Sequence, residues 1–267
     1  MSTPTSDVPI RLASTILLLR DGAQGLEVFM VVRHQEIDFA SGALVFPGGK
    51  LANGDRDPRV AARCTGVEGL SADQLALRVA AIREAFEECG VLLARPRPGS
   101  APLSAARLAQ LGERYRTRLD RGEIGIAEML ETEDLELTCE ALVPFAHWIT
   151  PPVMPKRFDT WFYVASAPPE QAALHDGREA VDSVWLRPDE AVEQEKSGAR
   201  TIVPATLLNV QKLGFSGSVD QALNAARTNP VVEVLPKVER REGGVLLRIP
   251  AEAGYGVTEF FMAMPGR

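Results

Sequence analysis

Three glutamates lie close together in the run from Arg83 to Val91, which reads Arg-Glu-Ala-Phe-Glu-Glu-Cys-Gly-Val. Glu84, Glu87 and Glu88 are spaced i, i+3 and i+4, so a helix would carry them on one face. Three crowded negative charges repel one another unless a positive charge lies among them. A hard divalent cation such as Mg²⁺ takes oxygen ligands, and proteins commonly hold it with a few carboxylates plus substrate phosphates. The run therefore predicts a helix that binds a divalent cation.

A glycine turn, Phe46-Pro47-Gly48-Gly49-Lys50, precedes this run in the sequence. Glycine has no side chain, so the backbone of such a turn can approach a ligand closely. A glutamate-rich helix face that is merely solvated is the alternative interpretation. The glycine turn before the glutamates and the Gly90-Val91 pair after them argue against it.

Together the two segments resemble the Nudix box, which reads Gly, five residues, Glu, seven residues, then Arg-Glu-aliphatic-x-Glu-Glu-x-Gly-aliphatic. The second half of the box matches at every fixed position. The first half departs from the pattern, because Asp55 stands five residues after Gly49 where the family has Glu. Between Asp55 and Arg83 lie 27 residues instead of seven, so an insertion of about twenty residues splits the box.

Nudix enzymes hydrolyse a diphosphate joined to another group, and the resemblance implies Mg²⁺ or Mn²⁺ as cofactor. It makes Glu84, Glu88 and the carbonyl of Gly48 ligands of the metal, and it makes Glu87 a further ligand or a base for the water. It implies that Arg83 braces the box by pairing with Glu87 one turn along. The family often adds a carboxylate from a later loop, for which Glu179 is the first candidate and Glu170 and Asp176 are weaker ones.

A longer resemblance, from about residue 11 to about 215, is to the Nudix branch of the mammalian peroxisomal coenzyme A diphosphatases. It rests on the split box, the segment 155–160 and the helical addition after the box. It implies hydrolysis of coenzyme A or acyl-coenzyme A to 3′,5′-ADP and (acyl-)4′-phosphopantetheine. Arg33, Lys156 and Arg157 are expected to meet anionic substrate groups, ordinary surface charge being the alternative.

Other substrates and one non-enzymatic function stay open at this point. ADP-ribose, another nucleoside diphosphate derivative or a dinucleotide would suit the same chemistry. A non-catalytic nucleotide sensor could keep the fold, but a sensor has no physical need for three mutually repelling glutamates. The small-molecule partner is thus expected to be a nucleoside diphosphate derivative.

Composition limits the remaining partners. The chain has 267 residues, 45% of them hydrophobic, and a net charge of −7 from 29 basic and 36 acidic residues. This charge disfavours nucleic acid, which needs a basic surface. We find no run long enough to span a bilayer and no targeting segment, so we expect a cytoplasmic protein without a membrane partner; a homodimer stays open.

Periodicity predicts an α+β protein, and the resemblance implies a Nudix fold with a mixed β-sheet sandwiched between helices and a helical insertion after the box. We expect one domain over 1–267, with a surface insertion at about 52–70 that holds a short helix near 58–63, a second insertion at about 96–135, and a C-terminal extension from about 216. Apolar β-rich runs predict strands at 11–20, 26–33, 41–46, 157–164 and 180–186, and over 137–149 with an interruption at Pro144. Helical spacing predicts helices at 72–89, 103–120, 123–132, from 188, 203–213 and 218–227. The tail, 231–238 and 244–249, predicts a hairpin.

Overall fold

A computed structural model of the chain describes residues 8–33, 42–171, 173 and 180–263. Its centre is an eight-stranded sheet in which β10, β2, β1, β9, β8 and β11 follow one another, with β3 paired to β2 and β4 to β1. Strand β1 runs parallel to β9 but antiparallel to β2 and β4, so the sheet is mixed. The strands are β1 (Ile10–Gly22), β2 (Gly25–Arg33), β3 (Leu44–Val45), β4 (Gly48–Lys50), β8 (Val143–Ile149), β9 (Arg157–Ser166), β10 (Ala180–Leu186) and β11 (Glu233–Val234).

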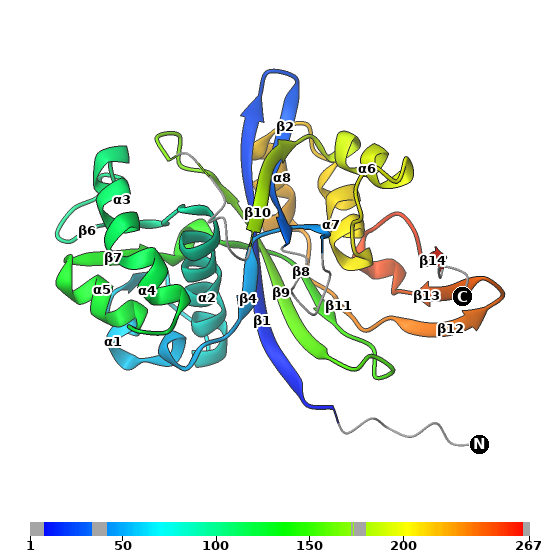
Figure 1. Ribbon diagram of the computed structural model, residues 1–267, viewed down its shortest axis with the longest axis horizontal. Helices are drawn as coiled ribbons and strands as arrows, with labels where there is room; N and C mark the ends of the chain where they lie inside the picture. The colour runs from blue at the N-terminus through cyan, green and yellow to red at the C-terminus, as the bar shows by residue number, and fades with distance from the viewer. Residues whose placement is uncertain (1–7, 34–41, 172, 174–179, 264–267) are drawn as a thin grey trace.

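Helices cover both faces of this sheet, as Figure 1 shows. Side chains alternate along β1, so Ile16 and Leu18 join the core beneath α2, whereas Leu17 and Leu19 join the core beneath α7 and α8. The expected sandwich of a mixed sheet between helices is confirmed. The helices next to the sheet are α2 (Ala72–Cys89), α6 (Pro188–Lys196), α7 (Pro204–Leu213) and α8 (Val219–Thr228).

The helical insertion packs beyond α2 (Figure 1). The predicted helix at 103–120 is continuous but contains one π-helical turn, η2, and the predicted helix at 123–132 is shorter. A small sheet ordered β5-β7-β6, in which β5 is Cys64–Thr65, closes this part of the molecule. The elements are β6 (Ala94–Pro96), α3 (Ala105–Leu111), η2 (Gly112–Arg116), α4 (Thr117–Asp120), α5 (Ile126–Thr132) and β7 (Leu135–Thr138).

The insertion 52–70 lies mostly at the surface, as expected, and α1 (Pro58–Ala61) is the short helix predicted there; η1 (Asn53–Arg56) and β5 (Cys64–Thr65), which pairs with β7, were not predicted. The apolar run 137–149 is interrupted before Pro144 and not at it, because Pro144 lies within β8. A 3₁₀ turn, η3 (Cys139–Ala141), divides it into β7 and β8, which belong to different sheets.

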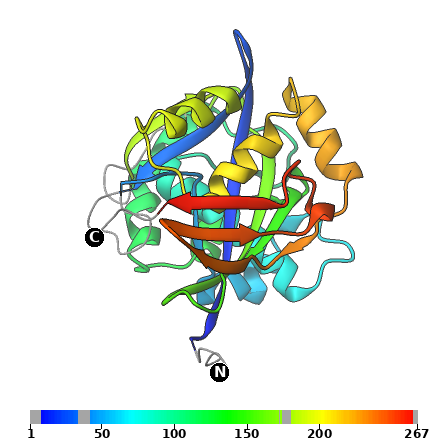
Figure 2. The same ribbon diagram turned by 90° about the vertical axis from the view of Figure 1, so that its right-hand side faces the viewer.

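The C-terminal extension joins the main sheet and then forms a sheet of its own. Strand β11 pairs in parallel with β8, and the chain continues into β12 (Lys237–Arg241), β13 (Gly244–Arg248), η4 (Ala251–Ala253) and β14 (Glu259–Ala263). Figure 2 shows these last three strands side by side in orange and red. The predicted hairpin is β12–β13, whereas β14 was not predicted. Within the described residues, no helix is both long and apolar enough to cross a bilayer.

Candidate metal and substrate site

The glycine turn is pressed between β1 and α2. Strand β4 pairs with β1 so that Gly48 lies opposite Thr15. A Cβ atom on Gly48 would lie 2.5 Å from the carbonyl oxygen of Ser14, and its φ of +156° also disfavours a side chain. A Cβ atom on Gly49 would lie 2.4 Å from Oε1 of Glu84. Gly48 is therefore needed for the turn to approach β1, whereas a Cβ atom on Gly49 would displace the Glu84 carboxylate.

Helix α2 has clear start and stop signals. Ser71 caps its first turn by accepting a hydrogen bond from the Gln74 amide, and the Gln74 side chain accepts one from the Ser71 amide. Gly90 ends the helix in the left-handed conformation, with φ of +71°. Both signals are local, so the sequence near each end determines where α2 begins and ends. These ends place Arg83, Glu84 and Glu88 in its last two turns.

Arg83 is buried among three carboxylates. Its Nε and Nη2 donate to the two oxygens of Asp55 at 2.8 and 3.0 Å. Its Nη1 donates to Glu84 at 2.9 Å and to Glu87 at 2.8 Å, which is the pair predicted from the sequence. Burial disfavours the charge of Arg83, but Glu84, Asp55 and Glu87 together raise its pKa above the ordinary value. Asp55 thus reaches the arginine although it is one methylene shorter than the family's Glu.

Glu87 and Glu88 are both buried beside the glycine turn. The Gly48 amide donates to Glu88 Oε2 at 3.0 Å. Glu87 Oε1 is a buried oxygen with no hydrogen-bond partner among the described residues. Burial, opposed by Arg83 and reinforced by the negative charge of Glu84, raises the pKa of Glu87 to about 8. A nearby positive charge would relieve this penalty.

The helical insertion is attached to the end of α2. The guanidinium of Arg116, in the π-helical turn, donates to the Glu87 carbonyl from Nη2 at 3.1 Å and from Nε at 3.3 Å. A cation at the C-terminus of a helix also stabilises the helix dipole. Arg116 therefore fixes the turn of α2 that carries Glu87 and Glu88.

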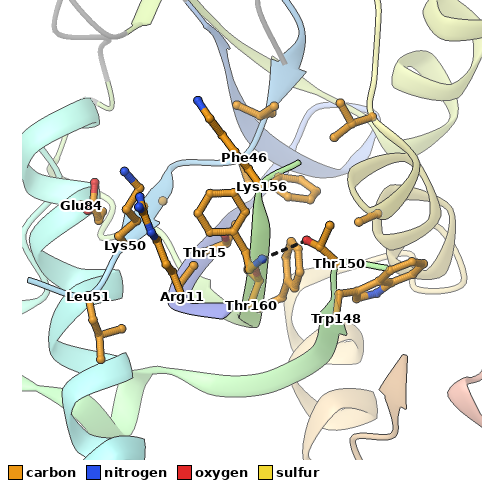
Figure 3. A pocket seen from close by; sticks show the side chains of 18 of the residues that line it. Arg11, Thr15, Phe46, Lys50, Leu51, Glu84, Trp148, Thr150, Lys156 and Thr160 are labelled. Carbon is orange, nitrogen blue, oxygen red and sulfur yellow. Dashed lines mark hydrogen bonds between the residues drawn. The ribbon is translucent and has the colours of Figure 1, made fainter. Parts of the chain in front are cut away.

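A cleft of about 1530 Å³ opens next to these carboxylates. Alternate side chains of β1 and their register partners on β9 form its floor, namely Arg11, Ala13 and Thr15 with Phe158, Thr160 and Phe162. Figure 3 shows Glu84, Lys50 and Arg11 at one side of the cleft and Thr150 and Trp148 at the other. The helical insertion forms a further wall through residues between Leu119 and Ile126.

The predicted substrate residues separate into two groups. Arg33 and Lys156 line the cleft, and Arg33 Nε is a buried donor without a partner among the described residues. Arg157 does not line the cleft; its Nε donates to the Thr150 carbonyl at 3.1 Å, so we interpret it as a brace between β8 and β9. Glu179 and Asp176 lie outside the described residues, and Glu170 is not among the lining residues.

Three basic residues that line the cleft, Arg11, Lys50 and Arg240, were not predicted to meet the substrate. Lys50 follows the glycine turn directly, and this position was the available signal. Arg11 enters the cleft because β1 pairs in parallel with β9, opposite Phe158. That pairing joins segments far apart in the sequence, so no local pattern could have indicated it.

The donor set fits a hard divalent cation. Three carboxylates from two turns of one helix supply the oxygen ligands that Mg²⁺ and Mn²⁺ prefer. The unpartnered, buried Oε1 of Glu87 is the observation that points to a missing positive group. Among the described residues, no three His, Cys, Asp or Glu side chains already surround a common point.

Comparison with known proteins gives consistent matches. A family model described as the NUDT19 Nudix domain matches residues 58–213. The acyl-coenzyme A diphosphatase NUDT19 of Xenopus laevis is 24% identical over 86% of this chain and 71% of its own length. The human protein of that name is 27% identical over 74% of this chain, which spans 63% of the human length. The crystal structure of a Nudix hydrolase from Alicyclobacillus acidocaldarius is 27% identical, with a TM-score of 0.70 over 84% of this chain and 98% of that one.

Proposed function

Because this chain belongs to the Nudix family described by the NUDT19 Nudix domain, we propose that it is a divalent-metal-dependent diphosphatase acting on coenzyme A or acyl-coenzyme A. The products would be 3′,5′-ADP and 4′-phosphopantetheine or its acyl thioester. The names of the frog and human relatives support this substrate. The observation that carries the proposal is the buried carboxylate cluster opening onto a large cleft with basic side chains.

The metal ligands we assign are Glu84, Glu87, Glu88 and the carbonyl of Gly48. When bound, Mg²⁺ or Mn²⁺ neutralises phosphate charge, polarises the reacting phosphorus and makes water a better nucleophile. The Gly48 carbonyl can be a ligand because glycine has no side chain that would separate its backbone from the carboxylates. Arg83 acts as a positioning residue, since its hydrogen bonds to Glu84 and Glu87 hold both side chains.

Glu87 is our candidate for the base. Its Oε1 has no hydrogen-bond partner among the described residues and is therefore available to take a proton from the attacking water. The pKa of about 8 applies without a cation, whose charge would favour the ionised carboxylate that a base requires. Glu179 stays a second prediction for this role, from the sequence alone.

The substrate phosphates would meet the basic side chains of the cleft. Arg33 and Lys156 were predicted for this role, and Arg11 and Lys50 line the same cleft. Charged donors bind phosphate more strongly than neutral ones. A nucleoside diphosphate derivative with several phosphates would therefore bind better here than a neutral ligand.

A substrate panel tests the proposal. With Mg²⁺ or Mn²⁺, we expect coenzyme A and its thioesters to be cleaved at the diphosphate, with both products identified by mass spectrometry. If the protein cleaves ADP-ribose efficiently but does not cleave coenzyme A, the family assignment stands and the proposed substrate is wrong. Binding without turnover of any compound would favour the non-catalytic sensor. A cytoplasmic location, a homodimer and the lack of a nucleic-acid partner stay predictions from the sequence.

A further inference from the structure

The C-terminal sheet presents one apolar face to the cleft. Cross-strand register pairs Val238 with Leu247 and Val245 with Met262, and all four side chains line the cleft. Arg240, opposite Val245, lies on the same face near the strand end and also lines the cleft. Neighbouring residues point the other way, because side chains alternate along a strand.

The outer face of this sheet has a different chemistry. It carries ion pairs between Arg241 and Glu239 at 2.7 Å and between Arg248 and Glu259 at 2.9 Å. Such exposed pairs are typical of a solvated face. The sheet therefore has an aliphatic face toward the cleft and a mixed outer face, on which these ion pairs lie beside Leu246 and the exposed Phe261.

The aliphatic face is only partly covered by the rest of the described chain. Val238, Val245 and Met262 are all partly exposed, whereas Leu247 is buried. When an apolar ligand covers partly exposed aliphatic side chains, apolar surface is removed from water and the free energy falls. This face is thus suited to a ligand with an alkyl segment.

The apolar lining continues along the cleft toward the carboxylates. Trp148 and Phe162 from the main sheet and Pro204 at the start of α7 line the same space as Glu84 and Gly48. At about 1530 Å³ the cleft exceeds the roughly 300–1,000 Å³ of an ordinary ligand pocket. A diphosphate at the carboxylates would leave room for a long substituent.

The aliphatic wall is held in place by buried hydrogen bonds. The Trp148 indole donates to the Tyr255 hydroxyl at 2.7 Å, and this hydroxyl donates to Asn209 at 2.8 Å. Lys212 donates to the Ala253 carbonyl at 3.1 Å. These contacts join the loop before β14 to the main sheet and α7. A wall fixed in this way costs little further ordering when a ligand binds.

We propose that this aliphatic face is the subsite for the acyl chain of an acyl-coenzyme A. The proposal rests on the proposed function and assigns a role to the C-terminal sheet, which lies beyond residues 58–213 of the family match. The side chains that line the cleft from this sheet include no aromatic ring on which an adenine base would stack. Their branched and thioether groups suit an alkyl chain instead.

The test compares coenzyme A with its butanoyl, hexanoyl and decanoyl thioesters in Mg²⁺ or Mn²⁺. We expect kcat/KM of the full-length protein to rise by about fourfold for each methylene that contacts the wall. In Val245→Asn, the ratio of kcat/KM for decanoyl-coenzyme A to that for coenzyme A should fall about tenfold. Met262→Gln, which keeps the side-chain length, should lower the same ratio. It replaces Val245→Asn as the test variant if Val245→Asn does not fold.

The matched control is Leu246→Asn, because Leu246 is the neighbour of Val245 on the opposite face and does not line the cleft. This control should keep the wild-type ratio within about twofold. Equal kcat/KM for all chain lengths, or equal losses in Val245→Asn and Leu246→Asn, would overturn the subsite.

A binding measurement separates this inference from the proposed function. In EDTA, calorimetry should give a more negative heat-capacity change for decanoyl-coenzyme A than for coenzyme A, since apolar surface is buried. If no thioester is hydrolysed but this difference is present, the proposed reaction is wrong and the subsite stands. Equal heat-capacity changes for the two ligands would overturn the subsite.

Discussion

Replacing Asp55 with Asn should weaken the anchor of the site. The Asp55 carboxylate accepts two hydrogen bonds from Arg83 and one from the Ala52 amide, and its side chain is fully buried. An Asn side chain has the same size, but its amide group must face one of these donors. Breaking a buried ion pair costs about 3–5 kcal/mol when the remaining charge has no partner. Arg83 keeps Glu84, Glu87 and the Lys50 carbonyl, so we expect the lower value of about 2–3 kcal/mol.

Urea unfolding in EDTA measures this loss as a lower midpoint with an unchanged m value. The turnover number should fall as well, because Arg83 positions Glu84 and Glu87. Asp57→Asn is the matched control: Asp57 lies on the surface of the same segment and caps α1, a role that Asn fills nearly as well. A loss below about 1 kcal/mol for Asp55→Asn would refute the assignment of Asp55 as the brace of Arg83.

Three further outcomes follow from single contacts. Gly49→Ala should lower kcat about 10- to 100-fold with the fold intact, because the new Cβ would displace the Glu84 carboxylate; wild-type kcat would contradict this. Glu87 has a pKa raised to about 8, so its contribution to stability without metal is present below pH about 4.5 and is lost as pH rises through about 8. The urea midpoint in EDTA should thus fall more between pH 6 and pH 9 for the wild type than for Glu87→Gln, and equal slopes would exclude this effect. Tyr255→Phe leaves Trp148 and Asn209 without their shared hydroxyl and should cost about 1–3 kcal/mol, a prediction that fails if the melting temperature is unchanged.

Local signals predicted the helix of the site well. Ser71 and Gly90 mark the ends of the helix that was predicted at 72–89, and the motif put Arg83 beside Glu87. Counting five residues from Gly49 also identified Asp55, whose buried contact with Arg83 confirms that the split box closes in space.

Features that depend on pairing between distant segments were not predicted. Arg11 enters the cleft through the parallel register of β1 with β9, and Met262 through the pairing of β14 with β13. The division of 137–149 between two sheets depends on β7 joining β5 and β6 in the small sheet. Periodicity identifies which face of a strand is apolar but does not identify the neighbour that it pairs with.

Hydrolysis of coenzyme A by Glu88→Gln tests the central claim most directly. Glutamine keeps the volume of Glu88 and can still accept the hydrogen bond from the Gly48 amide, so the fold should persist. Loss of its charge should lower the rate of 3′,5′-ADP formation about 10²–10³-fold at saturating Mg²⁺ or Mn²⁺. The wild type should form 3′,5′-ADP and 4′-phosphopantetheine in equal amounts. Near wild-type turnover by a folded Glu88→Gln protein would contradict a metal site built on the α2 carboxylates.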